Sequence, residues 1–170
     1  MLIALTGTPG TGKSTVAAEL ARRGYRITAA NDTIGPYITG DDPGRDARIV
    51  DTDRWREEFL VSDGIIEGHL SHLLPADRII ILRCHPGTLK ERLIRRGYHA
   101  EKIQENVEAE MLDVVLVEAL QEHTPEKLYE IDVTVMSVDE AADLIGRIIA
   151  GEATPGHGTV DWLSICPDML

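Results

Sequence analysis

Gly7-Thr8-Pro9-Gly10-Thr11-Gly12-Lys13-Ser14 is the stretch of sequence that decides the fold of this chain. It matches the pattern G-x-x-x-x-G-K-[S/T], in which glycines let backbone N–H groups converge on phosphate oxygens. The pattern is meaningful only between a strand and a helix. An apolar run at residues 2–6 precedes it, and an amphipathic run at residues 14–23 follows it. We therefore predict a phosphate-binding P-loop.

Each residue type in this loop has a chemical role in binding ATP and Mg²⁺. Lys13 is expected to neutralise the β- and γ-phosphates, and the Ser14 hydroxyl is expected to ligate Mg²⁺. Thr15 is placed to contact the α-phosphate, while the positive end of the following helix adds to the attraction. The predicted nucleotide-binding residues are Gly10, Thr11, Gly12, Lys13, Ser14 and Thr15.

Strand and helix patterns alternate along most of the chain, which predicts an α/β fold. We expect the three-layer P-loop NTPase fold with a five-stranded parallel sheet. Further strands are predicted at residues 25–29, 64–67, 78–83 and 129–135, and helices at 53–62, 86–96, 101–122 and 138–150. Residues 31–44 contain Gly35-Pro36 and a second cluster of Gly, Asp and Pro, so we expect an irregular insertion that covers a site.

Polar residues follow the strand predicted at residues 64–67. A P-loop enzyme needs an acidic group at the end of a neighbouring strand to hold the metal, usually through water. Glu67 fits this role, and Ser14 and Glu67 are the predicted metal-binding pair. His69 lies two residues further on, where it could orient a water molecule or contact the γ-phosphate; a structural role is the alternative. Glu67 and His69 are both candidate catalytic residues.

A group of arginines precedes Gly97 in a chain that is otherwise acidic. Phosphoryl transfer spreads negative charge over the migrating group, and arginines commonly stabilise that charge. Arg92 and Arg96 are four residues apart, so they share one face of a helix, with Arg95 beside them. We predict that Arg92 and Arg96 act with Lys13 in catalysis; a solvated helix end is the alternative reading.

The bulk composition narrows the class of protein. The chain has 170 residues, enough for one domain, and 29 acidic against 17 basic residues give a net charge of −12. This charge disfavours general nucleic-acid binding, and we expect no direct sequence-specific contact with nucleic acid. Cys84 and Cys166 are too few for a disulfide framework. No apolar run is long enough to span a membrane, and the N-terminus does not read as a signal peptide, so we expect a cytoplasmic protein.

Several motifs together resemble the adenylate kinase isoenzyme 6 family, also called CINAP. The resemblance covers most of the first 115 residues. It rests on residues 7–15 with Ala17, Asp51-x-Asp53-Arg54, Glu67-Gly68-His69, Glu91-Arg92-Leu93-x-x-Arg96-Gly97-Tyr98 and Lys102-Ile103-x-x-Asn106. In one place the chain differs from the family, because Glu67 stands where the acid-x-His motif usually has Asp.

The resemblance implies an adenylate-kinase-like fold with a short lid and a particular division of the chain. Residues 1–150 would form the kinase domain, with a monophosphate-binding insertion at about 31–60 and a lid at about 92–103; residues 151–170 would be a C-terminal tail. The implied activity is phosphate transfer from ATP to AMP, together with ATP hydrolysis. The implied partners are a ribosomal protein of the uS11 type and the small ribosomal subunit, whose maturation the family assists.

Three functions remain open at the level of sequence. The first is an enzyme that makes ADP from ATP and AMP. The second is an ATP-driven assembly factor in which hydrolysis switches binding to a ribosomal protein, with water aligned by His69. The third is a kinase for a small alcohol, which would need a carboxylate such as Asp32 as the base.

Overall fold

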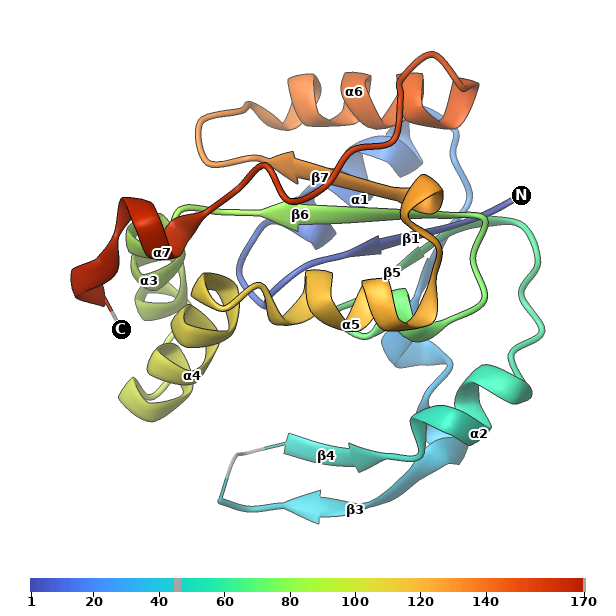
Figure 1. Ribbon diagram of the computed structural model, residues 1–170. Coiled ribbons are helices and arrows are strands. Elements are labelled where there is room, and N and C mark those ends of the chain that lie inside the picture. The colour runs from blue at the N-terminus through green and yellow to red at the C-terminus, as the bar shows by residue number, and fades with distance from the viewer. Residues whose placement is uncertain (45–46, 170) are drawn as a thin grey trace.

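One parallel sheet of five strands forms the centre of the protein (Figure 1). The computed structural model describes residues 1–44 and 47–169. The strands run in the order β2-β5-β1-β6-β7 and all neighbours are parallel. They are β1 (Leu2–Thr6), β2 (Ile27–Ala29), β5 (Gly64–Glu67), β6 (Arg78–Arg83) and β7 (Leu128–Asp132). The predicted fold class is confirmed.

Helices cover both faces of the sheet and make two separate cores. Helices α1 (Lys13–Arg22) and α6 (Val138–Ala150) lie on one face, and α5 (Val114–Glu122) lies on the other (Figure 1). Side chains alternate between the faces of a strand. In β1, Ile3 therefore joins the first core, whereas Leu2 joins the second. Burial on both faces explains why these strands read as unbroken apolar runs.

A helical unit lies beyond the carboxyl ends of the strands. It consists of α3 (Pro86–Arg95) and α4 (Ala100–Met111), joined by a turn at residues 96–99. The short C-terminal helix α7 (Trp162–Ile165) packs beside them (Figure 1). The predicted lid at residues 92–103 falls on the end of α3, the turn and the start of α4.

The predicted insertion contains regular structure, contrary to expectation. Two short 3₁₀ turns, Ala30–Asp32 and Gly35–Tyr37, lead into an antiparallel hairpin, which α2 (Thr52–Glu57) follows. The hairpin strands are β3 (Ile38–Asp42) and β4 (Ala47–Val50). Glycine and aspartate are uncommon in strands, so the run from Gly40 to Gly44 hid the hairpin. Residues 45 and 46 of the insertion, and residue 170 of the tail, lie outside the described residues.

The single helix predicted at residues 101–122 is wrong, because α4 and α5 are separate helices. Asp113 lies between them with φ of 55°, in the left-handed region that aspartate tolerates better than most residues. Its carboxylate accepts a hydrogen bond from Arg83 Nη2 at 2.5 Å, which helps to hold the break. The other elements differ from prediction only at their ends; the largest difference is in α2, which ends at Glu57 rather than at residue 62.

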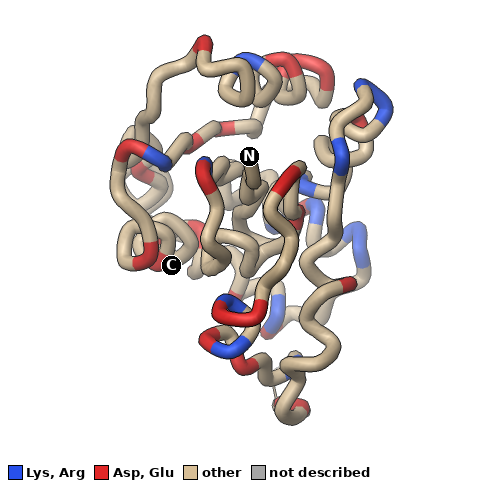
Figure 2. The backbone as a smooth tube through the Cα atoms, turned by 90° about the vertical axis from the view of Figure 1, so that its right-hand side faces the viewer, with Lys and Arg blue, Asp and Glu red and all other residues tan. Residues whose placement is uncertain are grey.

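The distribution of charge, the state of the cysteines and the length of the helices agree with the composition. Acidic segments are spread over the whole backbone tube rather than gathered in one region (Figure 2). Both cysteines, Cys84 and Cys166, are free thiols. Among residues 1–44 and 47–169, no helix combines the length and apolar character needed to cross a membrane.

Candidate active site

The loop between β1 and α1 has the backbone shape that phosphate binding requires. Gly7, Gly10 and Gly12 all have positive φ, at 139°, 99° and 109°. A Cβ atom on Gly7 would lie 2.4 Å from the carbonyl oxygen of Leu82 on β6, so no larger residue fits there. The loop is therefore pressed against the neighbouring strand and then turns directly into the N-terminus of α1, where backbone N–H groups attract anions.

Lys13 begins α1 and turns back into the loop. Its Nζ donates hydrogen bonds to the carbonyl oxygens of Gly7, at 2.7 Å, and Thr8, at 3.0 Å. The pKa of Lys13 is lowered from 10.5 to about 8, mainly because the side chain is buried. The carboxylates of Glu67 and Glu110 oppose this change. The ammonium group is thus still charged at neutral pH and is available as a counter-charge for phosphate.

Ser14 and Glu67 come together at the carboxyl edge of the sheet. Strand β5 pairs with β1 so that Glu67 lies opposite Leu5, just before the loop begins. The Ser14 hydroxyl donates a hydrogen bond to Glu67 Oε1 at 3.1 Å. A hydroxyl and a carboxylate are oxygen ligands of the kind that Mg²⁺ prefers, and Mg²⁺ takes its remaining ligands from phosphate and water. The two residues therefore fit the predicted metal-binding role.

Arg92 contacts the P-loop, and Arg96 lines the same hollow beside it. Arg92 Nη1 donates to the carbonyl oxygen of Thr11 at 3.2 Å. Both arginines line a small hollow of about 150 Å³ together with the loop. Its other wall consists of Val133, Met136, Ser137, Val138 and Ala141, at the end of β7 and the start of α6. Arg95 does not take part, because its largely exposed side chain faces Glu91.

His69 lies at the mouth of a second and larger cavity. Its side chain is solvent-accessible. Desolvation by the surrounding protein is the largest cause that lowers the pKa of His69 to about 4, and the nearby charge of Lys13 is the next. The ring is therefore neutral at pH 7 and offers one donor and one acceptor nitrogen. This state suits either of the roles predicted for His69.

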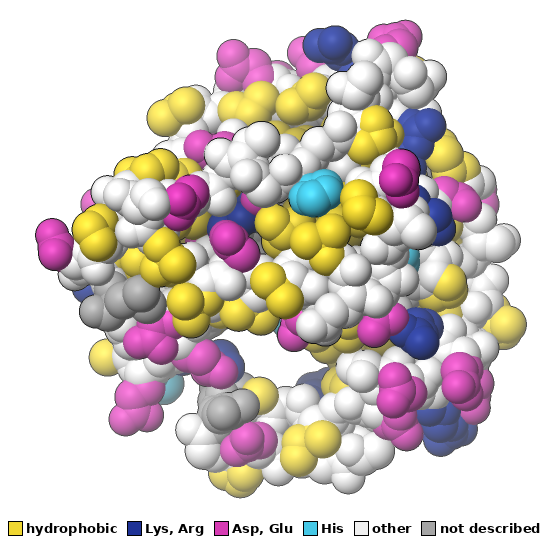
Figure 3. Space-filling view, viewed as in Figure 1, with side chains coloured by type: hydrophobic (Ala, Val, Ile, Leu, Met, Phe, Trp, Pro, Cys, Tyr) yellow, Lys and Arg dark blue, Asp and Glu magenta, His cyan; other side chains and the backbone are white. Residues whose placement is uncertain are grey.

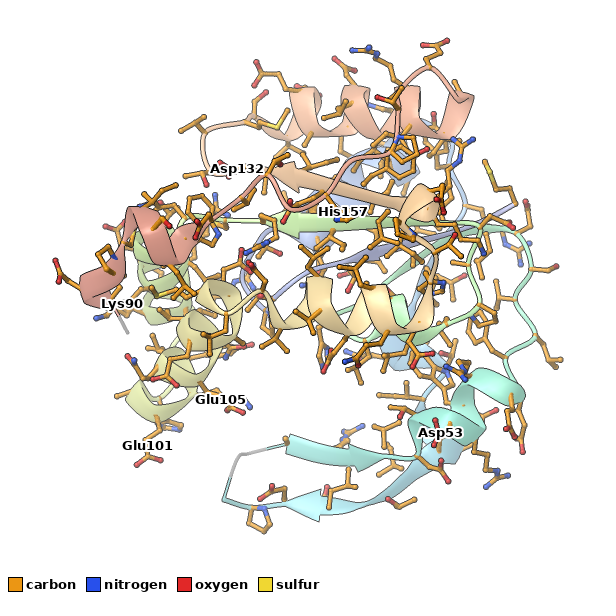
Figure 4. The ribbon with its side chains drawn as sticks, in the orientation of Figure 1. Asp53, Lys90, Glu101, Glu105, Asp132 and His157 are labelled. Carbon is orange, nitrogen blue, oxygen red and sulfur yellow. The ribbon has the colours of Figure 1, made fainter. Side chains whose placement is uncertain are left out.

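The larger cavity, of about 730 Å³, lies between the body of the protein and the β3–β4 hairpin, where the space-filling view shows an opening (Figure 3). The loop contributes Thr8 and Pro9 to its wall, and α4 contributes Lys102 and Asn106. A separate hollow of about 740 Å³, which shares Lys102 and Glu105 with this cavity, lies nearer the hairpin tip and is also lined by Pro43, Gly44 and Glu101. Glu101 and Glu105 are on α4 (Figure 4). The expectation that the insertion covers a site agrees with this arrangement.

Three polar residues around the site were not singled out from the sequence. Arg48 on β4 and Glu118 on α5 line the larger cavity. Glu110 on α4 is buried and accepts a hydrogen bond from the Thr8 hydroxyl at 2.5 Å, which ties α4 to the loop. No motif marks these residues, since each reaches the site from an element distant in sequence from the loop.

Buried Glu110 also anchors the C-terminal tail. Its Oε1 atom accepts hydrogen bonds from Arg83 Nε at 2.9 Å and from Trp162 Nε1 at 3.2 Å. The Trp162 ring is buried against α3 and α4, and it meets the ring of His85 edge to face. The C-terminal tail therefore folds back on the domain through Trp162.

Comparison with known proteins places this geometry in a family. A protein-family model described as "AAA domain" matches residues 3–113. A protein of Archaeoglobus fulgidus named "Putative adenylate kinase" is 48% identical over 176 residues, covering 100% of this chain and 96% of its own length. Proteins of the same name from Natronomonas pharaonis and Pyrococcus furiosus are 44% and 41% identical, and they cover 95% and 100% of this chain.

Solved structures share the fold at lower identity. The YorR protein of Bacillus subtilis, in complex with phosphorylated GDP, aligns with a TM-score of 0.60 at 20% identity, covering 89% of this chain and 97% of its own. Deoxyadenosine kinase from M. mycoides aligns with a TM-score of 0.58 at 18% identity, covering 90% and 100%. These structures show the fold alone, whereas the identities to the archaeal proteins show the family: the chain belongs to the family of archaeal proteins named "Putative adenylate kinase".

Proposed function

We propose that this protein is an adenylate kinase that transfers the γ-phosphate of ATP to AMP and forms two molecules of ADP. The observation that carries the proposal is the pair of hollows on the two sides of the P-loop, one beside Arg92 and Arg96 and one beneath the hairpin. Transfer between two nucleotides needs this arrangement, because the migrating phosphoryl group must lie in line between donor and acceptor.

The smaller hollow suits the base of ATP. Its wall at Val133, Met136 and Val138 is mainly apolar, and it opens directly beside the loop. With the base there, the phosphates extend along the backbone of residues 10–15 toward Lys13. Ser14 and Glu67 would hold Mg²⁺, which supplies charge neutralisation for the β- and γ-phosphates when bound.

The larger cavity suits the acceptor. An AMP phosphate is already ionised at neutral pH, so positioning replaces general base catalysis. Arg48 supplies a cation within this cavity, and Lys102, which pairs with Glu105 at 3.0 Å, supplies a second. Arg92 and Arg96 lie on the loop side, where they would stabilise the charge that spreads over the migrating group. Asp32, the base considered for an alcohol acceptor, is not among the residues that line the cavity.

A second activity, ATP hydrolysis, is favoured by His69. Its ring is neutral at pH 7 because its pKa is lowered to about 4, and a neutral imidazole at the cavity mouth can orient a water molecule in place of AMP. We further propose that the protein assists maturation of the small ribosomal subunit, and that this role would depend on ATP hydrolysis. The net charge of −12 complements a basic ribosomal protein of the uS11 type, which a pull-down at low salt would test.

A coupled assay of ATP consumption, with and without AMP, separates the two activities. The proposal expects AMP to accelerate ATP consumption and expects two ADP to form for each ATP used. If AMP leaves the rate unchanged and is recovered intact, the kinase function is refuted and hydrolysis remains. The His69→Ala variant is then expected to lose hydrolysis while it keeps its affinity for ATP; equal loss of both would indicate a structural histidine.

A further inference from the structure

Glu118 is an acidic side chain on the wall of the larger cavity, and one of its oxygens is held in place. It lies on α5, its side chain is 44% exposed, and Oε2 is 2.9 Å from Nε2 of His72. This hydrogen bond is the largest cause that lowers the pKa of Glu118, so the group is a carboxylate at neutral pH. Oε1 carries no hydrogen bond to His72 and can serve as an acceptor toward the cavity.

His72 fixes the direction of this carboxylate. The ring is fully buried, and Nδ1 lies 3.0 Å from the hydroxyl oxygen of Thr6 at the end of β1. The carbonyl oxygen of His72 accepts a hydrogen bond from His123 Nε2 at 2.7 Å. Because an ionised carboxylate only accepts, Nε2 of His72 must be the donor to Glu118. Glu118 is thus a preoriented acceptor rather than a freely rotating surface acid.

The wall of the larger cavity carries charged residues at one end and mainly apolar residues at the other. Toward the hairpin tip and the start of α4, its wall carries the cations Arg48 and Lys102, and Lys102 Nζ pairs with Glu105 Oε2 at 3.0 Å on the same wall. Toward the hairpin base and α5, the wall becomes apolar and Glu118 is the charged group there; the apolar residues are Ile34, Val50, Leu70, Val114 and Val115. A ligand with a phosphate at one end and a flat base with hydrogen-bond donors at the other matches this pattern.

We propose that Glu118 determines the specificity for the acceptor nucleobase by accepting a hydrogen bond from its exocyclic amino group. The inference rests on the proposed kinase function, which it deepens: the acceptor is a nucleoside monophosphate with an amino-bearing base. A base with an oxo group at the same position would face the carboxylate with a second acceptor. The two oxygens repel, and neither is satisfied, so such a base is rejected.

The test compares AMP with inosine monophosphate, which differs from AMP by an oxo group in place of the 6-amino group. In the wild-type protein, kcat/KM for AMP is expected to exceed that for inosine monophosphate by at least about tenfold. In Glu118→Gln, the amide oxygen can accept from His72 and the amide NH₂ can face the base. A donor then replaces the acceptor, so the preference is expected to reverse in favour of inosine monophosphate.

Two further variants test whether the change in substrate preference is specific to the carboxylate of Glu118. Glu118→Ala removes the acceptor without supplying a donor, and it is expected to bring the two substrates within about threefold of each other. Glu122→Gln makes the same change in charge one turn further along α5, where the side chain pairs with Arg56 outside the cavity. It is expected to leave the preference unchanged.

Equilibrium binding of the two monophosphates separates this inference from the proposed function. If no phosphate is transferred to either monophosphate, the kinase function fails, but the ratio of the two dissociation constants still reports on Glu118. If Glu118→Gln and Glu118→Ala both keep the wild-type ratio, in turnover or in binding, the role assigned to Glu118 is overturned while the kinase function stands.

Discussion

Replacing Lys13 with methionine is expected to abolish ATP binding and, at the same time, to stabilise the nucleotide-free protein. Lys13 as a whole residue is 7% exposed, and burial lowers the pKa of its side chain from 10.5 to about 8. Between these two pKa values the unfolded chain binds more protons than the folded protein, so wild-type stability rises with pH across that window. Below pH 8, the whole cost of burying the charged ammonium is present.

The size of the effect follows from the pKa difference. The fall in the pKa of Lys13 from 10.5 to about 8 corresponds, at about 1.36 kcal/mol for each factor of ten in proton affinity, to a cost on the order of 3 kcal/mol at pH 7. Methionine has a similar length and no charge, but it cannot donate to the carbonyl oxygens of Gly7 and Thr8, and the loss of these two hydrogen bonds costs about 1 kcal/mol each. The expected net gain is about 1 kcal/mol, or a rise in Tm of roughly 2 to 4 °C for a chain of this size.

Thermal and urea unfolding at pH 7, followed by circular dichroism, measure the gain, and calorimetric titration measures ATP binding. Lys90→Met is the matched control, because it makes the same charge change at an exposed position on α3 (Figure 4). Its stability is expected to stay within about 0.5 kcal/mol of wild type. If Lys13→Met is less stable than wild type while the control is unchanged, the reasoning from burial is refuted.

Three other perturbations test separate parts of the site. Because phosphates bind the protonated form of Lys13, ATP affinity is expected to fall above about pH 8, by up to about tenfold per pH unit; a flat profile in calorimetry to pH 10 would contradict this. Glu110→Ala removes a buried partner of Arg83 and is expected to cost about 3 kcal/mol in urea unfolding; a loss below about 1 kcal/mol would show that the pair is dispensable. Glu67→Gln should raise the Mg²⁺ concentration for half-maximal activity about tenfold, and an unchanged Mg²⁺ titration would remove Glu67 from the metal site.

The strands and helices that could be predicted are those whose pattern of apolar and glycine residues lies within a short stretch of sequence. The apolar run at β6 and the strand, glycine loop and helix around Lys13 carry their signals within a few residues, and both predictions are confirmed. The β3–β4 hairpin could not be predicted in this way, because Gly40 and its acidic neighbours do not favour a strand and only pairing with β4 makes one. The break at Asp113 is held in part by a hydrogen bond from Arg83, thirty residues earlier, and that contact leaves no local signal in the sequence.

The residues of the candidate site also fall into two groups, those that a short motif marks in the sequence and those that no motif marks. Ser14, Glu67, Arg92 and Arg96 belong to short motifs with fixed spacing, and the fold brings all four to the P-loop. Glu110 and Glu118, by contrast, read as ordinary helical acids in the sequence. Their importance comes from buried partners, Thr8 and Arg83 for the first and His72 for the second, which only the folded chain brings near.

The central claim is that one P-loop serves two nucleotides, and a crystal structure with a bisubstrate analogue, two adenosines joined by five phosphates, tests it most directly. The account predicts one analogue per chain, with one base against Val133 and Met136, the phosphates along residues 10–15, and the other base in the cavity beside Glu118. An analogue that places only one adenosine in the protein, with the larger cavity left to solvent, would contradict it.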